Sequence, residues 1–212
     1  MEFFDLLDGT SRKTGKTISR DEAHRTGAWH GAFHCLIVFQ RNGLGYALFQ
    51  KRSLAKKIAP GKFDVSVGGH YSAGEDAKTA GPREIREELG CAVFFEDLFP
   101  IGRRIFVYCF SEDANEYEFQ DVFLLPRAIH PDDLMLQREE VDSVFELEVN
   151  TGIELFSGSI STVAGNLIST DQKTIRFDVS AHDFVPCLDN YYLKLLLIAR
   201  RYLNGERGLL VI

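Results

Sequence analysis

Short apolar runs separated by polar, glycine-containing turns make up most of the first 150 residues, and this pattern predicts a series of β-strands. Residues 29–39, WHGAFHCLIVF, are largely apolar and β-prone, which is typical of a central strand buried on both faces. Residues 41–43, RNG, predict a turn back into a strand at residues 46–50. Further strands are predicted at residues 2–7, 63–67, 98–101, 104–110, 118–125 and 144–149.

Helix patterns occur near both ends of the chain. Residues 19–22, SRDE, have the form of a capping box that starts a brief helix. Residues 191–203 carry an apolar stripe at helical spacing, and Asn204-Gly205 ends this helix. Between them, residues 160–167 and 174–179 predict a hairpin with the polar tip STDQ.

Mixed strands and helices predict an α/β (α+β) fold. At 212 residues the chain is long for one average domain and short for two, so we expect a single domain over residues 1–212. We place its core at about residues 30–150, an N-terminal extension at residues 1–29 and a C-terminal extension at residues 151–212. We expect the C-terminal extension to cover the core, shape specificity or form a homodimer surface rather than to carry chemistry.

The charge balance limits the class of partner. Lys and Arg minus Asp and Glu give 24 − 31 = −7, which argues against nucleic-acid polymers and acidic membrane surfaces. The sequence contains no apolar stretch of the length that a membrane helix needs. The four cysteines are widely spaced, which favours buried free thiols in a reducing compartment. We therefore expect a cytoplasmic protein that acts on a small molecule.

The strongest chemical signal runs from residue 69 to residue 91, GHYSAGEDAKTAGPREIREELGC. It fits the pattern G-x5-E-x7-R-E-U-x-E-E-x-G-U, in which U is apolar. Its fixed Gly, Glu and Arg positions would align by chance in about one random chain of this length in a million. These positions are Gly69, Glu75, Arg83, Glu84, Glu87, Glu88 and Gly90.

Three glutamates of this motif share one helix face. Glu84, Glu87 and Glu88 stand at i, i+3 and i+4, so their carboxylates project from the same side. Like charges at this spacing repel, and oxygen-only ligands favour Mg²⁺ or Mn²⁺ as the counter-ion over Zn²⁺. Such an ion bridges carboxylates to a diphosphate and activates a water for attack on phosphorus. We predict that these glutamates bind metal and take part in catalysis.

The other fixed positions support this face. We expect Arg83 to orient one of the glutamates, with direct phosphate contact as the alternative. Pro82 indicates that the helix begins or bends there. Ile85 is expected to face the core, and Gly90 to take the left-handed conformation that ends the helix. The positions with a structural role in the motif are Gly69, Glu75, Ile85 and Gly90.

A cationic run and a glycine pair precede the motif. Lys51 and Arg52 are candidates to hold substrate phosphates, and solvated surface is the alternative. Gly68 and Gly69 allow the backbone to pass close to a ligand, and we place both of them, with His70, at the substrate.

Two further carboxylates follow the motif on a predicted strand. Glu116 and Glu118 alternate along it and therefore lie on the same side. We expect Glu116 to bind metal and Glu118 to be catalytic, and an exposed strand edge is the alternative. Glu140 is expected to be surface charge rather than a metal ligand.

The motif resembles the Nudix box, the signature of hydrolases that cleave a nucleoside diphosphate linked to another moiety. The resemblance covers about residues 1–150, and it implies an α/β/α sandwich around a mixed sheet and attack of water on a diphosphate with Mg²⁺ or Mn²⁺. Other segments resemble the Nudix branch related to isopentenyl-diphosphate isomerase, namely residues 23–25, 29–33, 50–53, 60–66 and 68–70.

Two other functions stay open. The isomerase places its metal ligands and its catalytic glutamate near five positions of this chain, namely His24, His30, His70, Glu116 and Glu118. It also needs a cysteine where this chain has Gly68, so the hydrolase is favoured, and each histidine is better explained by a hydrogen bond in the core than by metal binding. A non-catalytic nucleotide sensor does not need the carboxylates that this chain retains.

Overall fold

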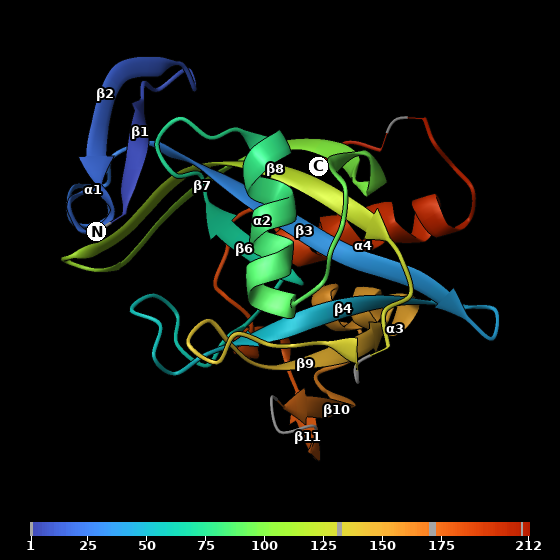
Figure 1. The fold of residues 1–212 in the computed structure, drawn as a ribbon. Coiled ribbons are helices and arrows are strands. Elements are labelled where there is room, and N and C mark those ends of the chain that lie inside the picture. Colours follow the sequence, from blue (N-terminus) through green and yellow to red (C-terminus); the bar gives the residue numbers. More distant parts are fainter. Residues whose placement is uncertain (1, 131–132, 170–172, 209) are drawn as a thin grey trace.

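The computed structural model describes residues 2–130, 133–169, 173–208 and 210–212, and a nine-stranded mixed sheet lies at its centre (Figure 1). Its strands are β3 (His30–Arg41), β4 (Leu44–Arg52), β5 (Phe63–Asp64), β6 (Val67–His70), β7 (Phe99–Ser111), β8 (Ala114–Pro126), β9 (Val141–Glu148), β10 (Val163–Ser169) and β11 (Thr174–Val179). Their order is β11-β10-β9-β4-β3-β8-β7, and β5 pairs with β4 while β6 pairs with β3. β3 and β8 are parallel, whereas β4 and β6 run antiparallel to β3.

The N-terminal segment forms a small layer of its own. β1 (Phe3–Leu7) and β2 (Lys13–Ser19) make a separate two-stranded antiparallel sheet, which leads into α1 (Arg20–Thr26). The Ser19 side chain accepts a hydrogen bond from the Glu22 amide, so the capping sequence starts the helix where predicted. This layer carries His24 toward the sheet, where α1 packs against β8.

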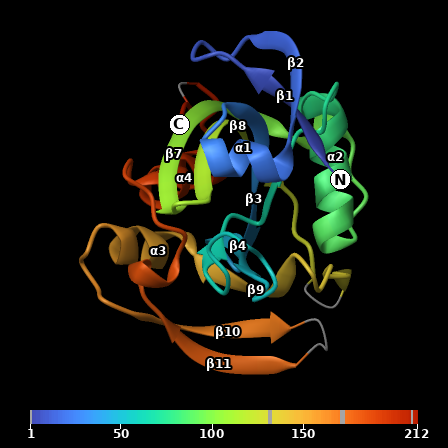
Figure 2. The same ribbon diagram turned by 90° about the vertical axis from the view of Figure 1, so that its left-hand side faces the viewer.

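Helices cover both faces of the large sheet (Figure 2). α2 (Ala77–Leu89) lies on one face, and α3 (Val149–Phe156) and α4 (Tyr191–Leu203) lie on the other. Successive β3 side chains point to opposite faces. Phe33, Cys35 and Ile37 therefore belong to the apolar cluster under α2, and Leu36 and Val38 belong to the cluster under α4. The predicted α/β/α sandwich is confirmed.

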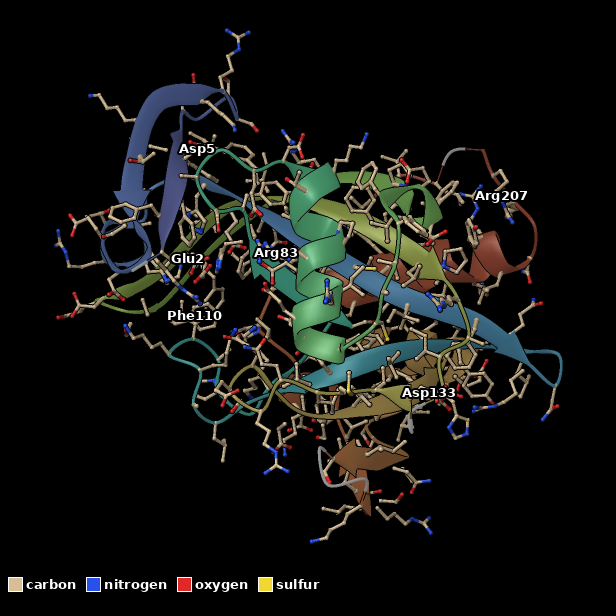
Figure 3. The ribbon with its side chains drawn as sticks, viewed as in Figure 1. Glu2, Asp5, Arg83, Phe110, Asp133 and Arg207 are labelled. Carbon is tan, nitrogen blue, oxygen red and sulfur yellow. The ribbon has the colours of Figure 1, made fainter. Side chains whose placement is uncertain are left out.

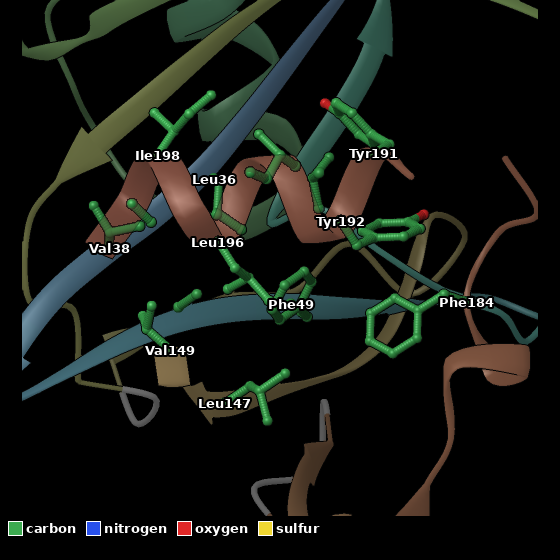
Figure 4. Packing of buried hydrophobic residues seen from close by; sticks show 14 of the residues in the cluster. Leu36, Val38, Phe49, Leu147, Val149, Phe184, Tyr191, Tyr192, Leu196 and Ile198 are labelled. Carbon is green, nitrogen blue, oxygen red and sulfur yellow. The ribbon is translucent and has the colours of Figure 1, made fainter. Parts of the chain in front are cut away.

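The larger apolar cluster joins the C-terminal extension to the core. α4 buries its apolar stripe against β3 and β4, with Leu196 near Leu36 and Phe49, as Figure 4 shows. Burying one Leu or Phe side chain contributes about 1.5–3 kcal/mol. The predicted helix at residues 191–203 is confirmed, and it holds Tyr191 and Tyr192 at its first turn.

A buried serine explains why the strand predicted at residues 63–67 is interrupted. The Ser66 hydroxyl accepts a hydrogen bond from the Ile37 amide at 2.8 Å and donates one to the Leu48 carbonyl at 2.5 Å. It thus lies between β3 and β4 where these strands separate. The chain then leaves β4 and continues beside β3 as β6, which delivers Gly68, Gly69 and His70 to the centre of the fold.

Two other elements differ from the prediction, and one was missed. The strands predicted at residues 98–101 and 104–110 are one strand, because the irregularity between them is a register shift at Gly102 that leaves the pairing with β8 intact. α3 was not predicted. α2 begins at Ala77 with Asp76 as its N-cap and runs through Pro82. Gly81 lets it approach the sheet, since a Cβ there would lie 2.7 Å from the Phe33 ring.

The cysteines differ in part from the prediction, whereas the C-terminal hairpin agrees with it. All four cysteines are free, but Cys35 alone is buried and Cys109 is exposed, so the expectation of buried thiols was wrong for the others. β10 and β11 form the predicted hairpin, and residues 170–172 of its tip lie outside the described residues. Within the described ranges, no helix combines the length and the apolar character required to cross a membrane.

Candidate active site and metal cluster

A pocket of about 370 Å³ is lined by all three parts of the chain. The N-terminal segment contributes His24, the sheet contributes His70 and Glu118, and the C-terminal segment contributes Cys187 and Tyr192. Pockets of this size accommodate small-molecule ligands. The C-terminal extension therefore forms part of the wall of the candidate site in addition to covering the core.

Three histidines and a glutamate form a compact cluster at this pocket. The ligand atoms of His24, His30, His70 and Glu116 all lie within 4.8 Å of one another. Strand pairing brings the three residues of the large sheet together, because His30 opens β3 directly beside Glu118, two residues after Glu116 on β8, and β6 places His70 beside Ala32. His24 comes from α1. Glu116 and Glu118 share one face of β8 as predicted, and both are buried rather than at an exposed edge.

The charges in the cluster are held close together. His70 Nε2 lies 2.9 Å from Glu118 Oε1 and 3.8 Å from Glu116 Oε2. Burial acts against the protonated form of His70, but the two carboxylates outweigh it and raise the pKa of His70 to about 9. Burial and the charge of Glu118 raise the pKa of Glu116, whereas the neighbouring histidines keep the pKa of Glu118 low despite its burial.

Two imidazole nitrogens of the cluster lack a partner. Among the described residues, His24 Nε2 and His30 Nε2 are the buried side-chain nitrogen or oxygen atoms without a hydrogen bond. Burial lowers the pKa of His24 to about 3, helped by His70 and His30, so its ring is neutral. Buried polar atoms normally find partners, and neutral imidazoles beside carboxylates are suitable ligands for a divalent transition-metal ion. Nε2 of both rings therefore lacks the hydrogen bond that we expected for these histidines in the core, although His30 Nδ1 has one to the Ala28 carbonyl.

The N-terminal strand covers this cluster. Phe4 is fully buried, and its ring lies 4.8 Å from the His30 ring and 4.9 Å from the His70 ring, measured between centroids. On its other ring nitrogen, His30 Nδ1 lies 2.8 Å from the Ala28 carbonyl, which orients the ring. The cluster is thus held in a water-poor environment on one side and opens to the pocket on the other.

Arg83 connects the acidic groups of the motif. Its guanidinium donates to both carboxylate oxygens of Glu75, to Glu84 at 2.8 Å and to Glu87 at 3.0 Å. It also donates to the His70 carbonyl at 3.2 Å. In the view of Figure 3, Arg83 lies on the side of α2 nearer to the N-terminal hairpin. The orienting role predicted for Arg83 agrees with this geometry, and Glu75 is its bidentate partner.

The three motif glutamates differ in exposure. Glu84 and Glu88 are buried and Glu87 is exposed. Glu88 accepts hydrogen bonds from Gln50 at 3.0 Å and from the Gly68 amide at 3.3 Å, and burial raises the pKa of Glu88 to about 8. None of the three glutamates is among the described residues that line the pocket. Gly68 and Gly69 line the pocket and contact Glu88 and Glu84, so they lie between the pocket and these two glutamates.

The remaining motif positions take the places that the pattern predicts. Ile85 is fully buried under the sheet, and Gly90 ends α2 with φ of 72°. Gly69 lies so close to Glu84 that a Cβ on it would overlap the carboxylate. A side chain at residue 69 would therefore displace one of the predicted ligands.

The cations at the pocket differ in part from the predicted set. Arg52 lines the pocket and contacts Asp64 at 3.5 Å, whereas Lys51 does not line it. Lys56 lines it and pairs with Glu140, so the expectation that Glu140 is plain surface charge was wrong. Lys56 follows Arg52 in the same cationic run, which was the signal in the sequence that pointed to it.

The C-terminal segment supplies contacts that the sequence analysis missed. Asp189 binds the Arg104 guanidinium through two hydrogen bonds of 2.8 and 2.9 Å. The Tyr191 hydroxyl lies 3.0 Å from His34 Nδ1, and the Tyr192 hydroxyl donates to Asp64 at 3.0 Å. These partners are far apart along the chain, and no spacing in the sequence connects them.

Comparison with known proteins relates the chain to one family. The NUDIX domain family model matches residues 28–153. An uncharacterized Nudix hydrolase of Clostridium acetobutylicum is 33% identical over 196 residues, which cover 90% of this chain and 93% of that protein. Nudix hydrolase 3 of Arabidopsis thaliana is 38% identical over 151 residues, covering 68% of this chain but 19% of that longer protein.

Solved structures share the fold. A crystal structure from Deinococcus radiodurans matches with a TM-score of 0.55 and 21% identity, covering 74% of this chain and 90% of that one. A MutT/nudix family protein from Enterococcus faecalis matches with a TM-score of 0.51 and 12% identity, covering 81% of this chain and 61% of that one. At these identities the likeness establishes the architecture of the chain.

Proposed function

This chain belongs to the Nudix hydrolase family, whose members act on phosphorus-containing acid anhydrides, and on that premise we propose that it is a divalent-metal-dependent pyrophosphohydrolase. The proposed substrate is a nucleoside diphosphate linked to another moiety, or a related organic diphosphate, attacked by water at phosphorus. The observation that carries the proposal is the histidine and glutamate cluster, in which two unpartnered buried imidazole nitrogens face carboxylates at a pocket of ligand size.

We assign the metal ligands to two groups. His24, His30, His70 and Glu116 would hold one ion, and their nitrogen content favours a transition-metal ion, Mn²⁺ included, over Mg²⁺. Glu84, Glu87 and Glu88 of α2 form the second group, whose oxygen ligands are suitable for Mg²⁺ or Mn²⁺. When bound, a divalent ion polarises a phosphoryl oxygen and lowers the pKa of a bound water.

The pocket cations and Glu118 have complementary roles. We assign the substrate phosphates to Arg52 and Lys56, which both line the pocket, rather than to Lys51. Glu118 lines the pocket and its pKa is held low, so it is ionised and can orient the attacking water. Gly68 and Gly69 also line the pocket, and their lack of side chains leaves room for the substrate there.

The two alternative functions are less well supported. An isomerase of isopentenyl diphosphate would need a thiol where Gly68 stands. A non-catalytic nucleotide sensor would not need the intact set of carboxylates on α2 and β8. Both alternatives predict that no diphosphate is hydrolysed, and the isomerase predicts a rearranged isopentenyl diphosphate.

An activity panel tests the proposal. Dinucleotide, sugar-nucleotide, coenzyme-A, nucleoside-triphosphate and isoprenoid-diphosphate compounds would be assayed with Mg²⁺ and with Mn²⁺ in ¹⁸O-labelled water. We expect turnover of at least one compound, with ¹⁸O in a product phosphate because water attacks phosphorus. Product without the label in a phosphoryl group would contradict this chemistry.

Variants locate the activity in the site. Glu87→Gln is expected to lower kcat/KM by several orders of magnitude while thermal unfolding stays close to wild type, because Glu87 is exposed and its carboxylate is needed for the metal. Glu96→Gln, an equally conservative change of an exposed glutamate outside α2, is the matched control. Full activity in Glu87→Gln would contradict the assignment of the α2 glutamates to metal.

A further inference from the structure

A chain of hydrogen bonds leads from the C-terminal extension to the metal cluster. Asp189 binds Arg104 on β7, Arg104 Nη1 donates to Gln120 Oε1 at 2.8 Å, and Gln120 Nε2 donates to Glu118 Oε2 at 2.5 Å. Glu118 in turn contacts His70 at 2.9 Å. Every link of this chain joins two side chains directly.

The sheet fixes the middle of this chain. Gln120 follows Glu118 by two residues on β8, so both side chains lie on the same face. Arg104 and Gln120 are directly opposite each other in the antiparallel pair of β7 and β8. Both are buried, with exposed fractions of 7% and 1%, so neither side chain has room to adopt many other arrangements.

Arg104 determines which way the Gln120 amide points. A guanidinium has hydrogen-bond donors and no acceptor, so the atom of Gln120 that faces it must be the carbonyl oxygen. The amide nitrogen then faces Glu118 and donates to it. One oxygen of Glu118 is thereby held by Gln120, and the other, Oε1, is directed toward His70 and His30.

Asp189 holds the Arg104 guanidinium in the position from which Arg104 donates to Gln120. Asp189 is the carboxylate that pairs with the buried guanidinium, and it takes both Nε and Nη2, which leaves Nη1 for Gln120. The Tyr191 and Phe106 rings lie 3.8 and 4.6 Å from the Arg104 guanidinium carbon and cover it. Without Asp189, the buried Arg104 guanidinium would need another carboxylate as its partner, and Glu118 lies next to Gln120.

We propose that Asp189 is a positioning residue for the metal cluster, acting through Arg104 and Gln120 to set the carboxylate of Glu118. This inference rests on the proposed function, because it concerns the ion that the cluster would bind. Asp189 lies outside residues 28–153, which the NUDIX domain family model matches. The C-terminal extension is thus connected to the proposed catalytic centre through Arg104 and Gln120, and Asp189 has a positioning role there.

The test measures Mn²⁺ affinity by electron paramagnetic resonance of free Mn²⁺, with full-length protein and no substrate. Asp189→Asn and Gln120→Met are each expected to weaken Mn²⁺ binding about 10–100-fold, the usual effect of removing a residue that orients a metal ligand. Asp183→Asn is the matched control, because Asp183 also lies in the C-terminal extension but bonds Ser180. It should bind Mn²⁺ like the wild type.

A double-mutant cycle separates positioning from general damage. If Asp189 acts through Gln120, the double variant should bind Mn²⁺ no more weakly than the weaker single variant, whereas independent structural effects would multiply. Gln120→Met keeps the pair of Asp189 with Arg104, so it tests the connection even if Asp189→Asn folds poorly.

The possible results have different meanings. Asp189→Asn or Gln120→Met binding Mn²⁺ as tightly as Asp183→Asn, or multiplied losses in the double variant, would overturn the positioning role alone. A wild-type protein that binds no Mn²⁺ would overturn the proposed metal cluster and this inference with it.

Discussion

The backbone of Gly69 lies directly against the carboxylate of Glu84, with no space for even a methyl group between them. Gly69→Ala must therefore displace the Glu84 side chain or shift β6. We expect a loss of about 1–3 kcal/mol in the free energy of unfolding, as in other overpacked sites, together with a large loss of activity. Denaturant titration and kcat/KM measure the two effects.

Gly9→Ala is the matched control for this change. Gly9 has open space around the position of a Cβ, so the variant should differ little from wild type in stability. A Gly69→Ala protein with wild-type stability and activity would show that Glu84 can move without consequence.

Arg83 should not tolerate replacement by lysine. Lysine cannot form the paired hydrogen bonds to Glu75 and also reach Glu84 and Glu87, because its ammonium is a single point of charge. We expect Arg83→Lys to lose about 1–3 kcal/mol in the free energy of unfolding and most of its activity. Arg86→Lys, on the exposed side of α2, should change neither by a comparable amount. Similar results for the two variants would contradict the connecting role of Arg83.

Replacing His24 should weaken the binding of Mn²⁺ more than the binding of Mg²⁺. His24→Gln removes a nitrogen ligand from the cluster but none from α2, so Mn²⁺ affinity should fall about 10–100-fold while Mg²⁺ affinity changes less. Titration calorimetry with each ion measures both values. His34→Gln, in the same pocket but outside the cluster, is the control. Equal losses for Mn²⁺ and Mg²⁺ in His24→Gln would argue against two separate groups of ligands.

His34 should make the fold sensitive to acid. Burial lowers the pKa of His34 to about 4, against about 6.5 in an unfolded chain. The unfolded state therefore takes up a proton first, and stability is lost as the pH falls from about 6.5 toward 4. Between pH 7 and pH 5 the wild type should lose about 2 kcal/mol more than His34→Gln, as measured by denaturant titration at each pH.

The exposed His182 provides the comparison for this prediction. His182→Gln should follow the wild-type pH dependence, because this side chain lies on the surface and not in the core. Parallel curves for wild type and His34→Gln would mean that His34 is protonated in the folded state at pH 5.

The sequence was sufficient to predict features that depend on local spacing. Helical periodicity placed α4, and alternation placed Glu116 and Glu118 on one side of β8. Ser66 illustrates what it could not show. Its side-chain hydrogen bonds replace part of a strand ladder, and no period of two or 3.6 residues reports such a substitution.

The candidate site was predictable to a similar extent. The motif could be recognised because its residues follow one another within a short segment, and Arg52 could be recognised because it belongs to a run of cations just before the motif. The unpartnered nitrogens of His24 and His30 favour a role as metal ligands. This could not be predicted from the sequence, because the surroundings of each ring are formed by segments that are distant in the chain. Asp189 was missed for the same reason, since its contact with Arg104 spans 85 residues.

The parallel pairing of β3 with β8 sets His30 beside Glu118 and Ala32 beside Gln120. A slip of one residue would turn every side chain of the slipped strand to the opposite face, so His30 and Glu118 could not stay side by side after a partial rearrangement of these strands. The ligands on the large sheet are therefore as durable as the sheet itself, whereas His24 comes from α1, outside it. On heating, His30, His70 and Glu116 should stay together until the large sheet unfolds in one cooperative step.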